Sequence, residues 1–159
     1  MTLEQSDFEH LLELRTGLRR FLRWSEEQAK AAGLTATKHQ LLLAIKGHPD
    51  PDGPTIGEIA DYLVLRHHSA VGLIDRAEKD GLVKRTPDPA SRSVVRVRLT
   101  PAGEAKLDAL AEVHLHEITH LAPTMQTLWR ALEDGDGDGA LARRFRGPRA
   151  DRAAGPARR

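Results

Sequence analysis

Residues 55–99 read TIGEIADYLVLRHHSAVGLIDRAEKDGLVKRTPDPASRSVVRVRL, and the spacing of their apolar residues changes from a helical to an extended period. Thr55 and Glu58 have the spacing of a capping box, which predicts a short helix that continues to Leu63. A second helix is expected over residues 66–80, because a glycine follows at once. Beyond that glycine, apolar and polar residues alternate, a pattern that is typical of strands.

The alternating residues predict a β-hairpin over residues 82–99. Its strands are expected at 82–85 and 95–99, and the prolines and aspartate between Pro87 and Arg92 favour a turn. A short helix, a tight turn, a second helix and a hairpin with a basic tip are, in that order, the elements of a winged helix-turn-helix domain. Such a domain fits a helix into the major groove of DNA and the thin ribbon into the adjacent minor groove.

Longer helices are predicted on both sides of this domain. Four apolar residues before it are spaced by three, four and three positions, as in a helix that packs against another helix. They are Leu11, Leu14, Leu18 and Phe21. After the domain, a helix is expected to begin at Thr100-Pro101 and to be broken or restarted at Pro123. The predicted fold class is therefore mainly α, with a small β-hairpin wing.

Composition excludes several classes of protein. The chain has 159 residues, 24 basic and 23 acidic side chains, and no cysteine, which excludes disulfides, thiolate metal sites, cysteine nucleophiles and thiol-based redox sensing. The net charge of +1 hides a zoned distribution, since residues 34–100 carry 10 basic and 8 acidic groups and residues 101–133 carry 2 and 5. Without a long apolar run or a signal-like amino terminus, a cytoplasmic protein that does not enter the membrane is expected.

Several segments of the chain, taken in order, resemble the MarR family of bacterial transcriptional regulators. They lie between Leu11 and Leu132. The segments that carry the resemblance are Leu34-Thr35, Ile56-Gly57-Glu58-Ile59-Ala60, Ser69 to Arg76, Gly81-Leu82-Val83, Asp88-Pro89-Ala90-Ser91-Arg92-Ser93, Val95 to Leu99 and Thr100-Pro101-Ala102-Gly103.

The resemblance implies a homodimer that binds double-stranded DNA. Residues 1–33 would form an N-terminal dimerisation helix, 34–100 the winged domain, and 101–133 the C-terminal dimerisation helices. Few large apolar residues and many glycines and arginines predict a flexible tail over 134–159, whose arginines could add DNA affinity or be solvated. We expect a repressor on a pseudo-palindromic site, with an activator as the alternative.

The expected DNA contacts come from the outer face of the second helix and from the wing. They are Arg66, His67, His68, Ser69, Gly72, Arg76, Ser91, Arg92 and Arg96. The glycine lets the backbone approach the duplex, and the basic groups suit phosphates and base edges. A solvated strand face is the alternative for Arg96. The resemblance implies that Arg92 enters the minor groove and that Asp75 pairs with it to orient the wing.

A small aromatic or anionic effector is also implied by the resemblance, in a cleft between the dimerisation and DNA-binding regions. Arg15, Trp24 and His39 are the candidate residues, because they place cationic and aromatic groups on or beside the first two helices. Ordinary core packing is the alternative for Trp24. No cofactor is expected.

One motif favours a different class of protein. His116-Glu117-Ile118-Thr119-His120 matches the H-E-x-x-H pattern of zinc peptidases. The extended form of that motif needs glycine and histidine where the chain has Pro123 and Gln126, so we expect no enzyme. A regulatory metal bound by His114, His116 and His120, and a winged helix that contacts only proteins, stay as alternatives.

Overall fold

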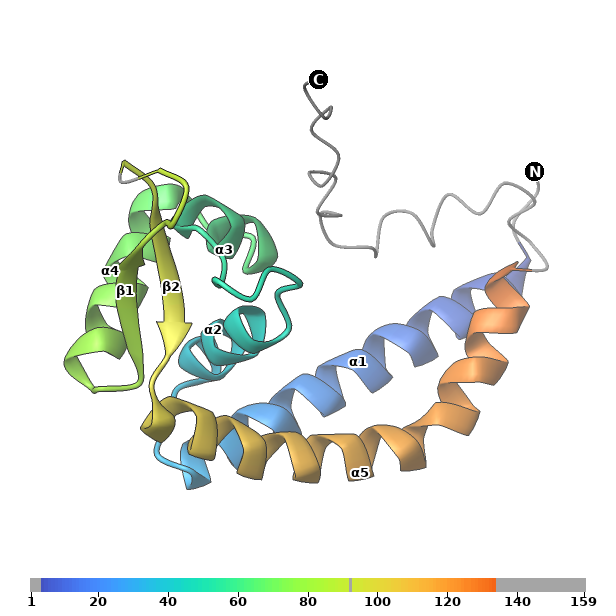
Figure 1. Cartoon of the computed structure of the whole chain (residues 1–159). Coiled ribbons are helices and arrows are strands. Elements are labelled where there is room, and N and C mark those ends of the chain that lie inside the picture. The colour runs from blue at the N-terminus through green and yellow to red at the C-terminus, as the bar shows by residue number, and fades with distance from the viewer. Residues whose placement is uncertain (1–3, 92, 134–159) are drawn as a thin grey trace, which may run out of the picture.

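The computed structural model describes residues 4–91 and 93–133, with side chains described as far as Thr119. Its elements are α1 (Gln5–Ala31), α2 (Ala36–Lys46), α3 (Ile56–Tyr62), α4 (His67–Lys79), β1 (Val83–Pro87), β2 (Val95–Leu99) and α5 (Pro101–Glu133). Figure 1 shows α2, α3, α4 and the β1–β2 hairpin gathered into one unit, called the winged unit below, from which α1 and α5 extend. This confirms the mainly helical fold with a two-stranded wing. Among the described helices, none is long and apolar enough to span a membrane.

Side-chain caps begin α2 and α3. The Thr35 hydroxyl accepts from the Lys38 N–H at 3.2 Å and so caps the start of α2. The Thr55 hydroxyl accepts from the Glu58 N–H at 3.3 Å, and the Glu58 carboxylate accepts from the Thr55 N–H at 2.8 Å. This reciprocal pair is the predicted capping box, which satisfies two N–H groups at the start of α3.

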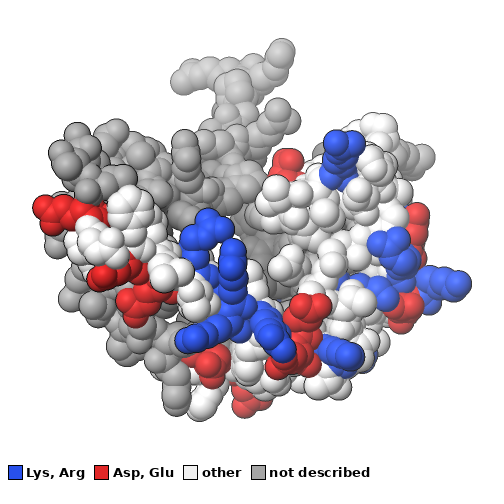
Figure 2. Space-filling view, turned by 180° about the vertical axis from the view of Figure 1, so that it is seen from behind, with Lys and Arg blue, Asp and Glu red and all other residues white. Residues whose placement is uncertain are grey.

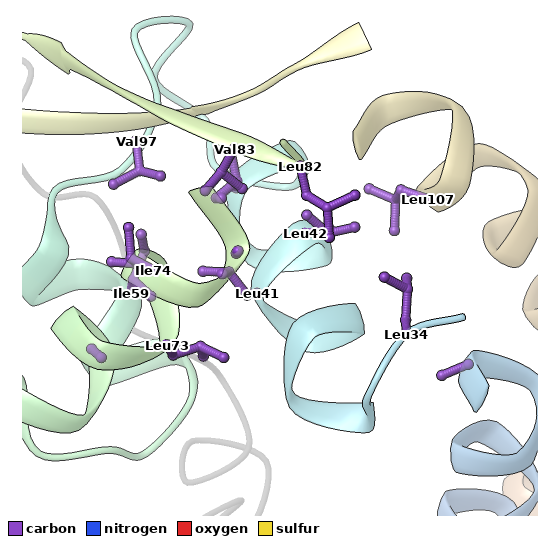
Figure 3. Packing of buried hydrophobic residues seen from close by; sticks show 14 of the residues in the cluster. Leu34, Leu41, Leu42, Ile59, Leu73, Ile74, Leu82, Val83, Val97 and Leu107 are labelled. Carbon is purple, nitrogen blue, oxygen red and sulfur yellow. The ribbon is translucent and has the colours of Figure 1, made fainter. Parts of the chain in front are cut away.

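The core of the winged unit draws side chains from all of these elements. Val83 and Val97 extend from the hairpin toward Ile59 and Ile74, and Leu107 of α5 lies beside the loop that precedes β1 (Figure 3). The strands are antiparallel, with Val83 opposite Leu99 and Pro87 opposite Val95. The fully or nearly buried apolar residues are Ala29, Leu34, Leu41, Leu42, Ile45, Ile59, Ala60, Ala70, Leu73, Ile74, Ala77, Leu82, Val83, Val97, Leu107 and Leu110.

The predicted break at Pro123 is wrong. Helix α5 runs without interruption from Pro101 to Glu133. Proline lacks an N–H, so the helix loses one hydrogen bond there, and the usual result inside a long helix is a bend rather than an end. Figure 1 shows that α5 does change direction in its last third.

The turn between α3 and α4 contains a strained residue. Val64 has φ of +53° and is 91% exposed, in the position that follows Leu63, the C-cap residue of α3. The N–H of Leu65 reaches back to the carbonyl of Ala60 at 2.8 Å, and that of Val64 to Asp61 at 3.2 Å. This is the helix ending that normally carries glycine, because a side chain with a branched β-carbon clashes with its own backbone there.

Val64→Gly is therefore expected to stabilise the protein. The relief of strain outweighs the extra entropy of the unfolded glycine, leaving a net gain of about 1 kcal/mol. Urea unfolding measures the effect, and Val64→Ala should recover only part of it because alanine keeps the β-carbon. A less stable Val64→Gly variant would contradict the left-handed backbone at this turn.

Candidate nucleic-acid interface

Helix α4 has one face in the core and the opposite face in solvent. Ala70, Leu73, Ile74 and Ala77 are buried. On the other side, Arg66, His67, His68 and Arg76 are exposed, while Ser69 and Gly72 are half-buried. The structure therefore brings the helical residues of the predicted DNA contact set onto one outward surface.

The N-terminus of α4 adds to the attraction of this surface for anions. Arg66 is the N-cap residue, and its side chain makes no capping hydrogen bond. The positive end of the helix dipole thus lies beside Arg66 and the first histidine of the helix, where a negative group is stabilised. A backbone phosphate is such a group.

Strand β1 is tied to α4 by one arginine. The guanidinium of Arg85 donates to Asp75 at 2.6 Å and also to the carboxylate of Glu78, which accepts the Arg85 N–H at 3.0 Å as well. The expected partner of Asp75 was Arg92, which lies outside the described residues. Within them, Asp75 of α4 pairs with Arg85 of β1. The sequence spacing of ten residues gave no sign of this pair.

Strand β2 carries its arginines differently from the prediction. Arg96 was expected to contact DNA, but its side chain is only 18% exposed and is bound by Asp50 and Asp88. Arg98, on the same face, donates to the carbonyl of Pro51 at 2.7 Å. Both guanidinium groups are thus directed at the α2–α3 loop, because that loop packs along the strand.

The connection between the strands is a closed turn. The Asp88 N–H donates to the Val94 carbonyl at 2.9 Å, and the Val94 N–H donates to Ser91 at 3.0 Å. Ser91 is half-buried and shares a side-chain hydrogen bond of 2.9 Å with Ser93. Arg92 lies outside the described residues, so its predicted place at the wing tip remains a prediction.

Charges of both signs share the visible surface. Figure 2 shows Lys and Arg side chains gathered near the middle and at one edge of this face, each group with Asp and Glu beside it. A single broad basic field is therefore absent from the described part of this face.

A second cluster lies where α1, α2 and α5 meet. The His114 ring of α5 lies 4.9 Å from Trp24, 4.7 Å from His39 and 6.2 Å from Phe21, measured between ring centroids. His114 Nδ1 donates to the Leu110 carbonyl at 2.7 Å, and its Nε2 pairs with the Ser25 hydroxyl at 2.7 Å. The structure thus brings together two of the three predicted effector residues around His114, a residue that sequence reasoning had considered only as a metal ligand.

Arg15 is not part of this cluster. It lies nine residues before Trp24 on α1, which corresponds to about 13 Å of helix. Of the candidate metal ligands, His114 has both ring nitrogens engaged, and the side chain of His120 lies outside the described residues. Among the described side chains, no group of three His, Asp or Glu is placed to hold a metal ion.

His39 makes the stability of the fold sensitive to pH. Its side chain is 6% exposed, and burial lowers its pKa, with a further lowering from His114. The folded chain keeps this imidazole neutral, whereas the unfolded chain takes up a proton as the pH falls below about 6.5. The free energy of unfolding should therefore decrease as the pH falls from 7 to 5.

The comparison with His39→Gln isolates this effect. The variant has no imidazole to protonate, so its free energy of unfolding should fall less over the same range. Urea unfolding at several pH values measures both proteins. Parallel pH profiles would show that His39 is not buried in its neutral form.

The fold agrees with comparisons to known proteins. Residues 32–92 match the MarR family. The chain is 48% identical over 50 residues to the uncharacterized HTH-type transcriptional regulator YsmB of Bacillus subtilis, covering 31% of this chain and 34% of YsmB. It is 32% identical over 83 residues to the transcriptional activatory protein BadR of Rhodopseudomonas palustris, covering 52% of this chain and 47% of BadR. The chain thus spans about a third to half the length of these relatives.

Solved structures extend the likeness of the fold to most of the chain. A MarR family protein from Bacillus stearothermophilus superposes with a TM-score of 0.70 at 22% identity, over 87% of this chain and all of that one. The repressor CouR bound to a 23-mer DNA duplex gives 0.62 at 24%, over 84% and 98%. CouR from Rhodococcus jostii bound to p-coumaroyl-CoA gives 0.65 at 21%, over 83% and 94%. Together these comparisons show a MarR-type winged helix-turn-helix region over residues 32–92 and the fold of MarR family transcriptional regulators over most of the chain.

Proposed function

We propose that the protein is a homodimeric, ligand-responsive repressor that binds a pseudo-palindromic DNA site in the cytoplasm. The observation that carries this proposal is the outer face of α4, whose exposed cations and imidazoles stand beside a wing fixed to the same helix by Arg85. His68, Ser69 and Arg76 are the proposed major-groove contacts, and Arg92 is the proposed minor-groove contact.

A second copy of the chain is the proposed cover for α1 and α5. Large apolar side chains along both helices are exposed in the single chain, and a row of this kind normally marks an interface. They are Phe8, Leu11, Leu12, Leu18 and Leu22 on α1, and Val113, Leu115 and Ile118 on α5. Burying them between two copies would place two winged units on one assembly, which matches the symmetry of a palindromic site.

The proposed dimer fixes the spacing of its DNA site. Two recognition helices that enter successive major grooves lie about 34–36 Å apart, so the half-sites would be about 10 base pairs apart. CouR was crystallised on a 23-mer duplex, which is long enough for two such half-sites. The same duplex length is a suitable starting point for this protein.

Selection from fragmented genomic DNA of the source organism tests the proposal. The protein is mixed with the fragments at several salt concentrations, with and without a chelator, and the retained fragments are sequenced. Recovery of one discrete sequence supports a regulator. Unselective, salt-sensitive recovery would indicate a general DNA binder, and no recovery would favour a module for protein contacts.

Repression is the proposed direction of control. Relatives of both kinds are known, since BadR is an activatory protein and CouR is a repressor. Within the described residues the chain consists of the winged unit and two long helices. Occupying a promoter is then the simplest way for it to act.

The effector is proposed to bind at the His114 cluster. The imidazoles of His39 and His114 and the rings of Phe21 and Trp24 offer flat, polarisable groups on which an aromatic effector could stack, at the junction of the long helices with the winged unit. CouR binds p-coumaroyl-CoA, so that compound and small phenolic acids are the first probes. Release of the selected DNA by a probe, and its loss in Trp24→Ala, would support this site.

The match to the MarR family also favours a transcriptional regulator over a zinc peptidase. MarR proteins are transcriptional regulators rather than enzymes, so the peptidase interpretation of His116-Glu117-Ile118-Thr119-His120 is set aside. Metal regulation through His114 is disfavoured for a physical reason, because a metal would have to displace the Leu110 or Ser25 hydrogen bond.

A further inference from the structure

The guanidinium of Arg96 binds two separate segments of the chain at once. Its Nε donates to Asp88 Oδ2 in the connection between the wing strands. One terminal nitrogen donates to Asp50 Oδ2 at 2.8 Å and to the Gly53 carbonyl at 2.7 Å, both in the α2–α3 loop. A planar group with fixed donors is suited to this task, because each acceptor lies along a defined N–H direction.

Asp88 uses its two oxygens for two different contacts. Oδ1 accepts from the backbone N–H groups of Ala90 at 2.8 Å and Ser91 at 2.9 Å, and so shapes the first turn of the wing connection. Oδ2 accepts from Arg96. The Asp88 side chain is buried, and its pKa is held below the ordinary value, chiefly by the Arg96 hydrogen bond and also by the N–H of Ala90 and Ser91.

The α2–α3 loop is also held against β2 by backbone contacts that do not involve the Arg96 side chain. The Val97 N–H donates to the Pro54 carbonyl at 2.9 Å, and Thr55 pairs with Arg96 as an isolated antiparallel bridge. Gly53 has φ of +85°, and a β-carbon there would lie 2.3 Å from the Val97 carbonyl oxygen. The loop therefore provides a rigid support, and Arg96 transmits its position to the wing connection.

From these contacts we infer that Asp50, Arg96 and Asp88 form a wing clamp, which positions the wing connection for DNA, and that Arg96 acts through Asp88 rather than on a phosphate. This inference rests on the proposed function. It assigns a positioning role to two aspartates that neither the charge pattern nor the family match identifies.

The negative charge of the two aspartates allows an experiment to distinguish the wing clamp from a simple effect of net charge on DNA binding. Asp50 and Asp88 both lie near the edge that is proposed to face phosphates, where a carboxylate on its own repels DNA. Removing one of these charges should tighten binding if only bulk charge matters. The wing clamp predicts the opposite result.

Asp88→Asn is the main test variant. The asparagine oxygen can still accept from Ala90 and Ser91, but the charged partner of Arg96 is gone. We expect the Kd for the selected duplex to rise about tenfold at fixed salt, the cost of losing one charged hydrogen bond per site. Asp50→Asn should act in the same direction. Asp52→Asn, on the same loop, is the charge-matched control and should bind as the parent does or more tightly.

Arg96→Lys separates positioning from direct contact. Lysine keeps the charge, so a phosphate contact would survive with nearly the parent affinity. It cannot reproduce the fork that reaches Asp50 and Asp88 together, so the wing clamp predicts a loss similar to that of Asp88→Asn. The slope of log Kd against log salt should stay at the parent value, because no phosphate contact is removed.

A measurement without DNA completes the test. In both variants, the ¹⁵N order parameters of Ala90 and Ser91 should fall from a rigid value of about 0.85 towards about 0.6, while those of α4 stay unchanged. Parent-like affinity in Arg96→Lys, or tighter binding in Asp88→Asn, would overturn the wing clamp while leaving the DNA-binding proposal intact. If the parent selects no duplex, the proposed function fails and with it the role in positioning for DNA, even if the order parameters fall.

Discussion

Gly103→Ala is expected to lower the thermal midpoint by about 10 °C, corresponding to a loss of about 3 kcal/mol. A β-carbon at this position would lie 2.0 Å from the carbonyl oxygen of Leu82 and 2.9 Å from its carbonyl carbon. Both are backbone atoms, so no side-chain rotation relieves the clash. The first turn of α5 would have to move away from the corner between α4 and β1.

That corner joins the winged unit to the long helix. The Thr100 hydroxyl donates to the Gly81 carbonyl at 2.6 Å and accepts from the Gly103 N–H at 3.1 Å, while the Thr100 N–H donates to Leu82 at 3.1 Å. Displacing α5 would strain this whole set of hydrogen bonds. The loss of stability should therefore exceed that of a typical surface substitution several times over.

Circular dichroism melts of Gly103→Ala and Gly57→Ala provide the measurement and its control. A β-carbon on Gly57 would meet only the Thr55 hydroxyl, at 3.9 Å, and glycine inside a helix is itself unfavourable. Gly57→Ala should thus melt at or slightly above the parent temperature. A parent-like melt for Gly103→Ala would mean that α5 does not approach Leu82 as closely as described.

Arg92→Ala is expected to weaken DNA binding about a hundredfold, at about 1.4 kcal/mol for each of two wings in a dimer. Arg92 itself lies outside the described residues, but the turn that surrounds it is closed by the hydrogen bond from Val94 to Ser91. A cation carried at such a tip suits the negative potential of a narrow minor groove. Fluorescence anisotropy with the selected duplex, over a salt series, measures the effect.

The control for Arg92→Ala is an arginine on a different part of the molecule. Arg23 lies on α1, is exposed, and pairs with Glu27 at 3.3 Å. Arg23→Ala removes the same charge without touching the winged unit, so its affinity should stay near that of the parent. Both variants should sediment as the parent does. Equal affinities for Arg92→Ala and the parent at every salt concentration would refute the wing contact.

The winged unit was largely predictable because its signals are local. A capping box at Thr55 and Glu58, a glycine after α4 and the alternation from Val95 to Leu99 each act within a few residues. The helix across Pro123 was not predictable in this way, because a proline removes only one hydrogen bond from a long helix and need not end it.

The roles of the charged residues were harder to predict, because their partners are distant in sequence. Arg96 has the residue type of a DNA contact, but Asp50 is 46 positions earlier and only the folded loop brings them together. The pairing of Arg85 with Asp75 depends on where β1 lies against α4. His114 likewise forms a hydrogen bond with Ser25, which is 89 positions earlier in the sequence.

A hydroxyl-radical footprint on the selected site tests whether a dimer of this chain binds a specific duplex. We expect two protected half-sites about 10 base pairs apart, which appear together as the protein concentration rises and disappear together in excess salt. Arg92→Ala should remove protection from both. Protection indistinguishable from that of a scrambled duplex of equal length, at the same salt and protein concentration, would contradict the account.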